Sequence, residues 1–353
     1  MNEEEEKKEV GEPKRHSRIH IEVNDIGEKG KKSMWARTWI ALVMILILLP
    51  AAILGGWVFA AAILVAAVMA TYEIYKAPQK KFPWWIFAIT LVNVITLIYW
   101  PIIYVNVVGA LQNEDWVFTL EGSFSYYGIV IQVVHIGIMM LIYFWIGVGS
   151  KDFDFGDVAH FITMILLVGL GLQSALVLRF YPYWHMMDDV GNIGAFQSFW
   201  QSLELLLFAV LGACINDTFA YFVGVLFGKH HMNEKISPKK TWEGFFGGWF
   251  FGAAFAIGFG LIVSVCGAPM LPGLFDADHW YWIVVAGILL PLVGDLGDLS
   301  FSLIKRHYGF KDYSHLLGPH GGLLDRLDSL IFCFLTLAMV VSMATTAENL
   351  IVF

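Results

Sequence analysis

Long runs of apolar residues, separated by short polar segments, fill the chain from Trp35 onward. A helix that crosses the hydrocarbon core of a bilayer needs about 20 mostly apolar residues, and these runs have that length. We therefore predict about nine transmembrane helices in an all-α, polytopic integral membrane protein. The predicted spans are residues 37–54, 57–75, 83–105, 125–148, 157–181, 200–227, 244–266, 279–304 and 323–346.

The composition supports this class and argues against a soluble domain. The 353 residues are 58% hydrophobic, and the mean hydropathy of +0.66 is high for a soluble fold. Residues 1–36 are polar and carry acidic and basic patches, so we expect a disordered cytoplasmic tail. We expect residues 37–195 to form the N-terminal transmembrane helices and residues 196–353 to form a catalytic transmembrane region.

The distribution of Lys and Arg predicts which side of the membrane each connection faces. With the tail in the cytoplasm, the basic connections all fall on the cytoplasmic side, at residues 76–82, 149–156, 228–243 and 305–322. Neither Lys nor Arg occurs in the connections predicted outside, at residues 106–124, 182–199 and 267–278. This separation follows the positive-inside rule. The net charge of −8 arises from acidic residues in the outer segments, so it does not argue against an anionic partner.

The stretch from Gly294 to Asp328 concentrates charged residues between two apolar runs. Asp295 and Asp298 are three residues apart and share a helix face, and Asp325 repeats this spacing with Asp328. If the two runs form an antiparallel hairpin, both acidic pairs meet at one membrane surface. Grouped carboxylates suit Mg²⁺, which binds one or two of them together with substrate phosphates. The pattern therefore predicts metal-assisted phosphoryl or nucleotidyl transfer at a membrane surface.

Helix capping is an alternative explanation for part of this pattern. Asp325 and Asp328 lie in the first turn of a predicted helix, where negative charge is favoured by about 0.3–1 kcal/mol. Asp295 and Asp298 lie near the end of their apolar run, where the helix dipole disfavours a carboxylate. A bound cation explains all four acidic residues more simply than capping does.

Acidic residues also fall inside or near other predicted spans. Asn216 and Asp217 either form a structural pair within the bundle or belong to the metal or substrate cavity. Glu73 and Glu204 have no motif around them, and we assign them no function. In the segment 228–243, the positive-inside rule alone is enough to explain the lysines.

Two blocks of polar residues in the C-terminal half follow a recognisable pattern. The first block is Asn216-Asp217-x-x-Ala220-Tyr221, Gly228-Lys229-His230 and Ile236-Ser237-Pro238-Lys239-Lys240-Thr241-Trp242-Glu243-Gly244. The second block is Ser302-x-x-Lys305-Arg306, Lys311-Asp312 and His320-Gly321-Gly322-x-x-Asp325-Arg326-x-Asp328. Together they resemble the signature of the phosphatidate cytidylyltransferases, also called CDP-diacylglycerol synthases. Two departures are Gly318-Pro319, where the family usually has Pro-Gly, and Phe301, where many members carry an acidic residue.

The resemblance implies an enzyme that transfers CMP from CTP to phosphatidic acid, with its active site facing the cytoplasm. It implies Mg²⁺ as cofactor, together with a second cation such as the monovalent K⁺. Asp298 and Asp325 are the expected principal metal ligands, supported by Asp328 and Asp217. Asp298 belongs to the family's Gly-Asp-Leu pattern, whereas Asp295 does not.

The other site residues are assigned from the same resemblance. Lys305, Arg306 and Lys311 are expected to hold phosphates during catalysis, and Asp312 to orient the basic loop. His320 is open to three roles, as a base, a phosphate donor or a turn residue. The expected substrate-binding residues are Asn216, Asp217, Ser237, Lys239, Lys240, Thr241, Ser302, His320, Gly321, Gly322 and Arg326.

Two rival functions are compatible with parts of the sequence. A CTP-dependent lipid-alcohol kinase would also join a cytidine triphosphate to a membrane substrate. A cation-coupled transporter would explain the intramembrane carboxylates Asp217 and Asp298, but the chain lacks the internal repeat typical of transporters. We expect membrane lipid and a second copy of the chain, in a homodimer, as partners, and no nucleic acid.

Overall fold

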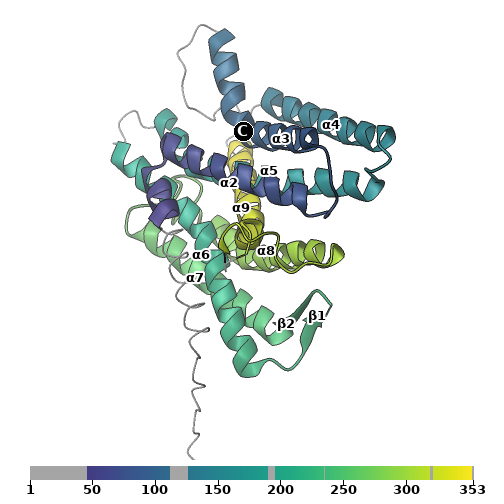
Figure 1. The fold of residues 1–353 in the computed structure, drawn as a ribbon. Coiled ribbons are helices and arrows are strands. Elements are labelled where there is room, and N and C mark those ends of the chain that lie inside the picture. The colour runs from purple at the N-terminus through teal and green to yellow at the C-terminus, as the bar shows by residue number, and fades with distance from the viewer. Residues whose placement is uncertain (1–45, 112–125, 190–194, 234, 319–320, 352–353) are drawn as a thin grey trace, which may run out of the picture.

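The computed structural model describes residues 46–111, 126–189, 195–233, 235–318 and 321–351. Helices make up most of this part of the chain, and two short strands form a hairpin between α6 and α7 (Figure 1). Residues 46–54 are helical and precede α2. The elements that follow are α2 (Gly56–Lys76), α3 (Trp84–Leu111), α4 (Tyr126–Gly149), α5 (Phe155–Asp189), α6 (Ala195–Phe227), β1 (His231–Asn233), β2 (Ser237–Thr241), α7 (Trp242–Val265), α8 (Trp280–His307) and α9 (Leu324–Ile351).

Within the described residues, eight helices are long and apolar enough to cross a membrane. They are α2 to α9, and each corresponds to one predicted span. The predicted all-α, polytopic membrane fold is therefore confirmed. Residues 37–45, which are half of the first predicted span, and all of the predicted tail, residues 1–36, lie outside the described residues.

Helix α9 lies at the centre of the bundle (Figure 1). It packs against α5, α6 and α8, so it joins the N-terminal helices to the C-terminal ones. The interior is apolar and includes Leu97 of α3, Leu176 of α5, Leu205 of α6 and Leu337 of α9, which are all fully buried. Because α8 and α9 pack side by side as an antiparallel hairpin, the polar residues near their connection lie at one end of the bundle.

Helices α6 and α7 approach each other closely because α7 presents glycines to α6. Gly248 is buried, and a Cβ atom added there would lie 2.7 Å from the carbonyl oxygen of Asn216 and 2.8 Å from Cβ of Ala220. A side chain at this position would separate the two helices. Small residues at such contacts are typical of membrane helices, in which close van der Waals contact drives association.

We predict that Gly248→Ala lowers the thermal unfolding midpoint of the purified protein, because overpacking typically costs about 1–3 kcal/mol. Gly258→Ala in the same helix is the matched control, since a Cβ there would meet nothing within 4 Å. The control should leave the midpoint unchanged or raise it, because alanine favours helix more than glycine does. Equal midpoints for the two variants would contradict the proposed close contact.

Candidate active site

Lys240 joins the two aspartates of α8. Its Nζ lies 2.7 Å from Oδ1 of Asp295 and 2.9 Å from Oδ2 of Asp298. Asn216 of α6 donates a 3.0 Å hydrogen bond to the other oxygen of Asp295. Asp295 is only 1% exposed, and a buried carboxylate is costly unless it is both paired and hydrogen-bonded. The cluster therefore fixes strand β2 and helix α6 against α8.

The β1–β2 hairpin and the first turn of α7 position Lys240. Strand β2 ends at Thr241, which is the N-cap of α7 and accepts a 3.2 Å hydrogen bond from the backbone N–H of Gly244. Glu243 then reaches back to the start of the hairpin, where its Oε1 lies 2.6 Å from Nδ1 of His230 and its Oε2 accepts from two backbone N–H groups at 3.2 Å. The hairpin is thereby anchored to a membrane helix at both of its ends.

Lys240 remains charged at neutral pH although it is partly buried. Burial alone would lower the pKa of Lys240, but the carboxylates of Asp298 and Asp295 raise it above the ordinary lysine value. Because the pKa is raised on folding, the stability that this cation contributes is present at neutral pH. It is lost only as the pH rises through the folded-state pKa.

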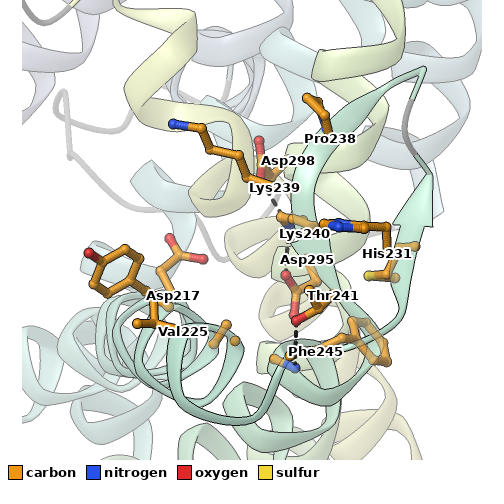
Figure 2. Close-up of a pocket in the computed structure, with 16 residues that line it drawn as sticks. Asp217, Val225, His231, Pro238, Lys239, Lys240, Thr241, Phe245, Asp295 and Asp298 are labelled. Carbon is orange, nitrogen blue, oxygen red and sulfur yellow. Dashed lines mark hydrogen bonds and ion pairs between the residues drawn. The ribbon is translucent and has the colours of Figure 1, made fainter.

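A cavity of about 610 Å³ opens beside this ion cluster, between α6, the hairpin and α8. Figure 2 shows Asp217 of α6 on one side of the cavity and Lys240 with Asp295 on the other. Apolar side chains such as Val225 and Phe245 form another part of the wall. A cavity with a charged side and an apolar side suits a ligand that has both characters.

Asp325, at the start of α9, has three partners of its own. Its Oδ1 lies 2.8 Å from Nζ of Lys305, and its Oδ2 accepts hydrogen bonds from the backbone N–H groups of Tyr313 at 2.8 Å and Gly322 at 2.9 Å. Asp325 lies in the first turn of α9, whereas Gly322 precedes the helix, so this bond ties the entering chain to the helix start. This carboxylate fixes the α8–α9 connection to the end of α8.

Asp298 of α8 and Asp328 of α9 lie close enough together for their carboxyl groups to interact. Ser302 also donates a 3.4 Å hydrogen bond to Asp298. Among the described residues, no three His, Cys, Asp or Glu side chains are grouped as a complete metal site. Mg²⁺, however, commonly takes one or two carboxylates and completes its shell with phosphates and water. Two neighbouring carboxylates have the donor chemistry that fits Mg²⁺.

Glu73 of α2 caps the start of α9 from across the bundle. Its Oε1 accepts hydrogen bonds from Oγ of Ser314 at 2.6 Å and from the backbone N–H of Leu323 at 2.7 Å, and its Oε2 accepts from the N–H of Leu324 at 2.8 Å. Glu73 is fully buried. The first N–H groups of a helix lack partners within the helix and favour a negative charge. A Cβ atom at Gly322 would lie 2.5 Å from Oε1 of Glu73, so the connection passes close to this carboxylate.

The remaining predicted residues divide into two groups. Lys239 and Thr241 line the cavity together with Asp217 and Lys240. Outside the cavity lining, in the described part of the chain, are Asn216, Ser237, Ser302, Lys305, Arg306, Lys311, Asp312, Gly321, Gly322, Asp325, Arg326 and Asp328. His320 lies outside the described residues. The cavity and the α8–α9 connection are therefore two parts of the predicted site, joined through Asp298.

Two site residues were not assigned from the sequence. Asp295 lies outside the family's Gly-Asp-Leu pattern, so the sequence places it in the acidic cluster but gives it no role of its own. Glu73 was given no function, because its partners lie more than 200 positions away, with |i−j| of 241 for Ser314. No pattern within α2 reveals such a contact.

The eight membrane helices and the charged cavity define a polytopic membrane protein with a site suited to a ligand that is both ionic and apolar. A model of the cytidylyltransferase family matches residues 35–344. The chain therefore belongs to the cytidylyltransferase family, as its motifs suggested. This membership makes it a nucleotidyltransferase-type enzyme and gives no support to the kinase alternative.

Curated relatives agree with this membership. A protein of Staphylococcus epidermidis strain RP62A, named phosphatidate cytidylyltransferase, is 31% identical over 306 residues, which are 85% of this chain and 95% of the relative. A protein of the same name from Staphylococcus aureus strain COL is 30% identical over 303 residues, with the same shares of each chain. One from Aquifex aeolicus is 42% identical over 132 residues, or 37% of this chain and 44% of the relative.

We predict that Lys240→Met destabilises the protein by about 3 kcal/mol, because it leaves two largely buried carboxylates without their cation. Lys239→Met is the matched control, since this neighbouring lysine on the same strand is exposed and forms no ion pair with any of the described residues. Thermal unfolding in detergent should show a clear drop for the first variant and little change for the second. Similar midpoints for both would disprove the structural role of Lys240.

Glu73→Gln should lower both stability and activity, because an uncharged amide at this position accepts fewer of the three hydrogen bonds and lacks the charge favoured at a helix start. Glu204→Gln provides the control, since Oε2 of Glu204 is buried and has no hydrogen-bond partner among the described residues. Its neutral replacement should not lower the unfolding midpoint. If the two variants behave alike, Glu73 does not act as a cap.

Proposed function

We propose that the chain transfers CMP from CTP to phosphatidate, forming CDP-diacylglycerol and releasing pyrophosphate. The family membership and the names of relatives that match 85% of the chain support this activity. The observation that carries the proposal is the ion cluster of Lys240, Asp295 and Asp298 in the wall of a cavity that also has apolar lining. The phosphates of a nucleoside triphosphate and of a lipid headgroup need a charged surface, and the acyl chains of the lipid need an apolar one beside it.

The chemistry requires no nucleophilic side chain. A phosphatidate oxygen is already ionised near neutral pH, so it can attack the α-phosphorus of CTP directly. The new P–O bond forms as the bond from the α-phosphorus to the bridging oxygen breaks, and pyrophosphate leaves with that oxygen. Positioning and neutralisation of charge then determine the rate. Lys239 and Lys240 line the cavity and are suited to binding phosphate oxygens.

For Mg²⁺, we propose Asp298 and Asp325 as the principal ligands, supported by Asp328 and Asp217. When bound, Mg²⁺ neutralises the oxygens of a triphosphate and orients them. Lys305, near the C-terminal end of α8, forms an ion pair with Asp325 of α9. Its positive charge therefore lies beside the same group of acidic residues. The second cation, such as K⁺, and the homodimer remain predictions.

We also propose that the site faces the cytoplasm, where CTP is available. The basic connections carry Lys239, Lys240 and Lys305 on one side of the predicted topology, and the positive-inside rule assigns that side to the cytoplasm. Cysteine-accessibility labelling in whole cells would test this orientation. Exposed residues such as Pro238 of the hairpin offer a labelling position close to the site.

The decisive test is incubation of the purified protein with radiolabelled CTP and phosphatidate in detergent, with and without Mg²⁺. We expect a CDP-lipid product from the wild type, and a loss of about 10²-fold or more in Asp298→Asn and in Asp325→Asn. Asp278→Asn, an exposed acid at the opposite end of α8, should keep full activity.

The mass of the lipid product identifies the reaction. An added CMP supports the proposed transfer, whereas a single added phosphate would indicate a kinase. Retained activity in both aspartate variants would contradict the assignment of Asp298 and Asp325 as Mg²⁺ ligands. Flux of a cation into proteoliposomes without any turnover of CTP would show that the protein is a transporter and not an enzyme.

A further inference from the structure

A second cavity, of about 330 Å³, lies at the end of α2. It shares no lining residue with the larger cavity beside Lys240. One wall is the last turn and a half of α2, and the other is the segment that follows Asp312 in the α8–α9 connection. The lining residues are Tyr72, Lys76, Tyr313, Ser314, His315 and Leu316.

The charge of this second cavity favours an anion. Lys76 is exposed and is the last residue of α2. Its Nζ lies 5.8 Å from the ring centre of Tyr72 and 5.9 Å from that of Tyr75, and it forms no ion pair with a carboxylate in the described part of the chain. The nearest acid in sequence, Glu73, is fully buried and its oxygens already accept three hydrogen bonds. The cavity therefore presents a cation, and none of its lining residues is an acid.

The surface of α2 that leads to this cavity is suited to an acyl chain. Val65, Val68 and Tyr72 precede Lys76 at spacings of three and four residues, so all four lie on one face of the helix. The three apolar residues are 60%, 40% and 41% exposed. An apolar stripe that ends in a lysine at the membrane surface matches a lipid, with its chain along the stripe and its phosphate at the lysine. A soluble phosphate would make no use of the stripe.

We propose that this second cavity binds the phosphate headgroup of an anionic glycerophospholipid, and that the bound lipid supports the active site. Oγ of Ser314, in the cavity wall, donates its 2.6 Å hydrogen bond to Glu73, which caps α9. The adjacent residue Tyr313, also in the wall, donates its backbone N–H to Asp325 at 2.8 Å. A headgroup that orders this wall also orders the residues that hold Asp325. The effect on activity, but not the binding itself, rests on the proposed function.

Binding can be measured without CTP, using the full chain and a photoactivatable phosphatidylglycerol in phosphatidylcholine nanodiscs. We expect Lys76→Gln to reduce labelling about fivefold, since a lysine near the surface contributes about 1 kcal/mol to binding an anionic lipid. Lys76→Arg keeps the charge and should keep the labelling. Lys81→Gln, which removes an exposed lysine outside the cavity on the same side of the membrane, is the matched control.

Labelling that is unchanged in Lys76→Gln, or that falls equally in Lys81→Gln, overturns the proposal. Competition by glycerol 3-phosphate as strong as that by unlabelled phosphatidylglycerol also overturns it, because the site would then not require an acyl chain. Peptide mapping of the crosslink should place it on α2 or on residues 313–316. A crosslink located elsewhere contradicts the site.

The effect on activity is tested by CMP transfer at fixed phosphatidate, with and without phosphatidylglycerol. The rate should rise with phosphatidylglycerol in the wild type and in Lys81→Gln, but not in Lys76→Gln. If labelling depends on Lys76 but the rates of all variants respond alike, the link to the active site is wrong. If labelling depends on Lys76 and no variant transfers CMP, the proposed function fails while the lipid site stands.

Discussion

The ion cluster around Lys240 is the interaction on which the rest of the site depends. Asp295 and Asp298 lie on a membrane helix, where an unpaired carboxylate is strongly unfavourable. Lys240 supplies the opposite charge from the hairpin beside the ends of α6 and α7 (Figure 1), and Asn216 supplies a hydrogen bond from a third element. Three segments distant in the sequence are thereby held together, and the cavity is the space between them.

A second set of contacts holds the α8–α9 connection in place. Glu73 and Asp325 both accept backbone N–H groups at the start of α9, one from α2 and the other from within α9 itself. The connection contains Gly321 at a φ of 83°, a value that non-glycine residues rarely adopt, so its path is specified locally as well. The N-terminal helices therefore take part in the site through Glu73, although none of the recognised motifs lies in them.

Part of this arrangement could be predicted from the sequence because it depends on local or adjacent residues. Helix length is set by the bilayer, so the apolar runs identify α2 to α9. Asp298 and Asp328 flank one connection, and a helical hairpin necessarily brings them close. The pairing of Lys240 with Asp295, separated by 55 positions, could not be predicted in this way. The positive-inside rule explains a lysine in that loop equally well without any partner, so its charge alone does not reveal the contact. The helix dipole predicts a cation near Asp295 and Asp298, but it does not predict that a lysine supplies this charge.

The order of these residues along the chain has a consequence for biosynthesis. Asn216 and Lys240 both precede Asp295, so the two partners are synthesised before the carboxylate that requires them. Insertion of an aspartate at the centre of a helix costs about 3 kcal/mol when it meets lipid alone. With α6 and the hairpin already in place, α8 enters the membrane beside a counter-charge and an amide donor. Its two acidic residues need not remain unpaired at any stage after translation of the helix.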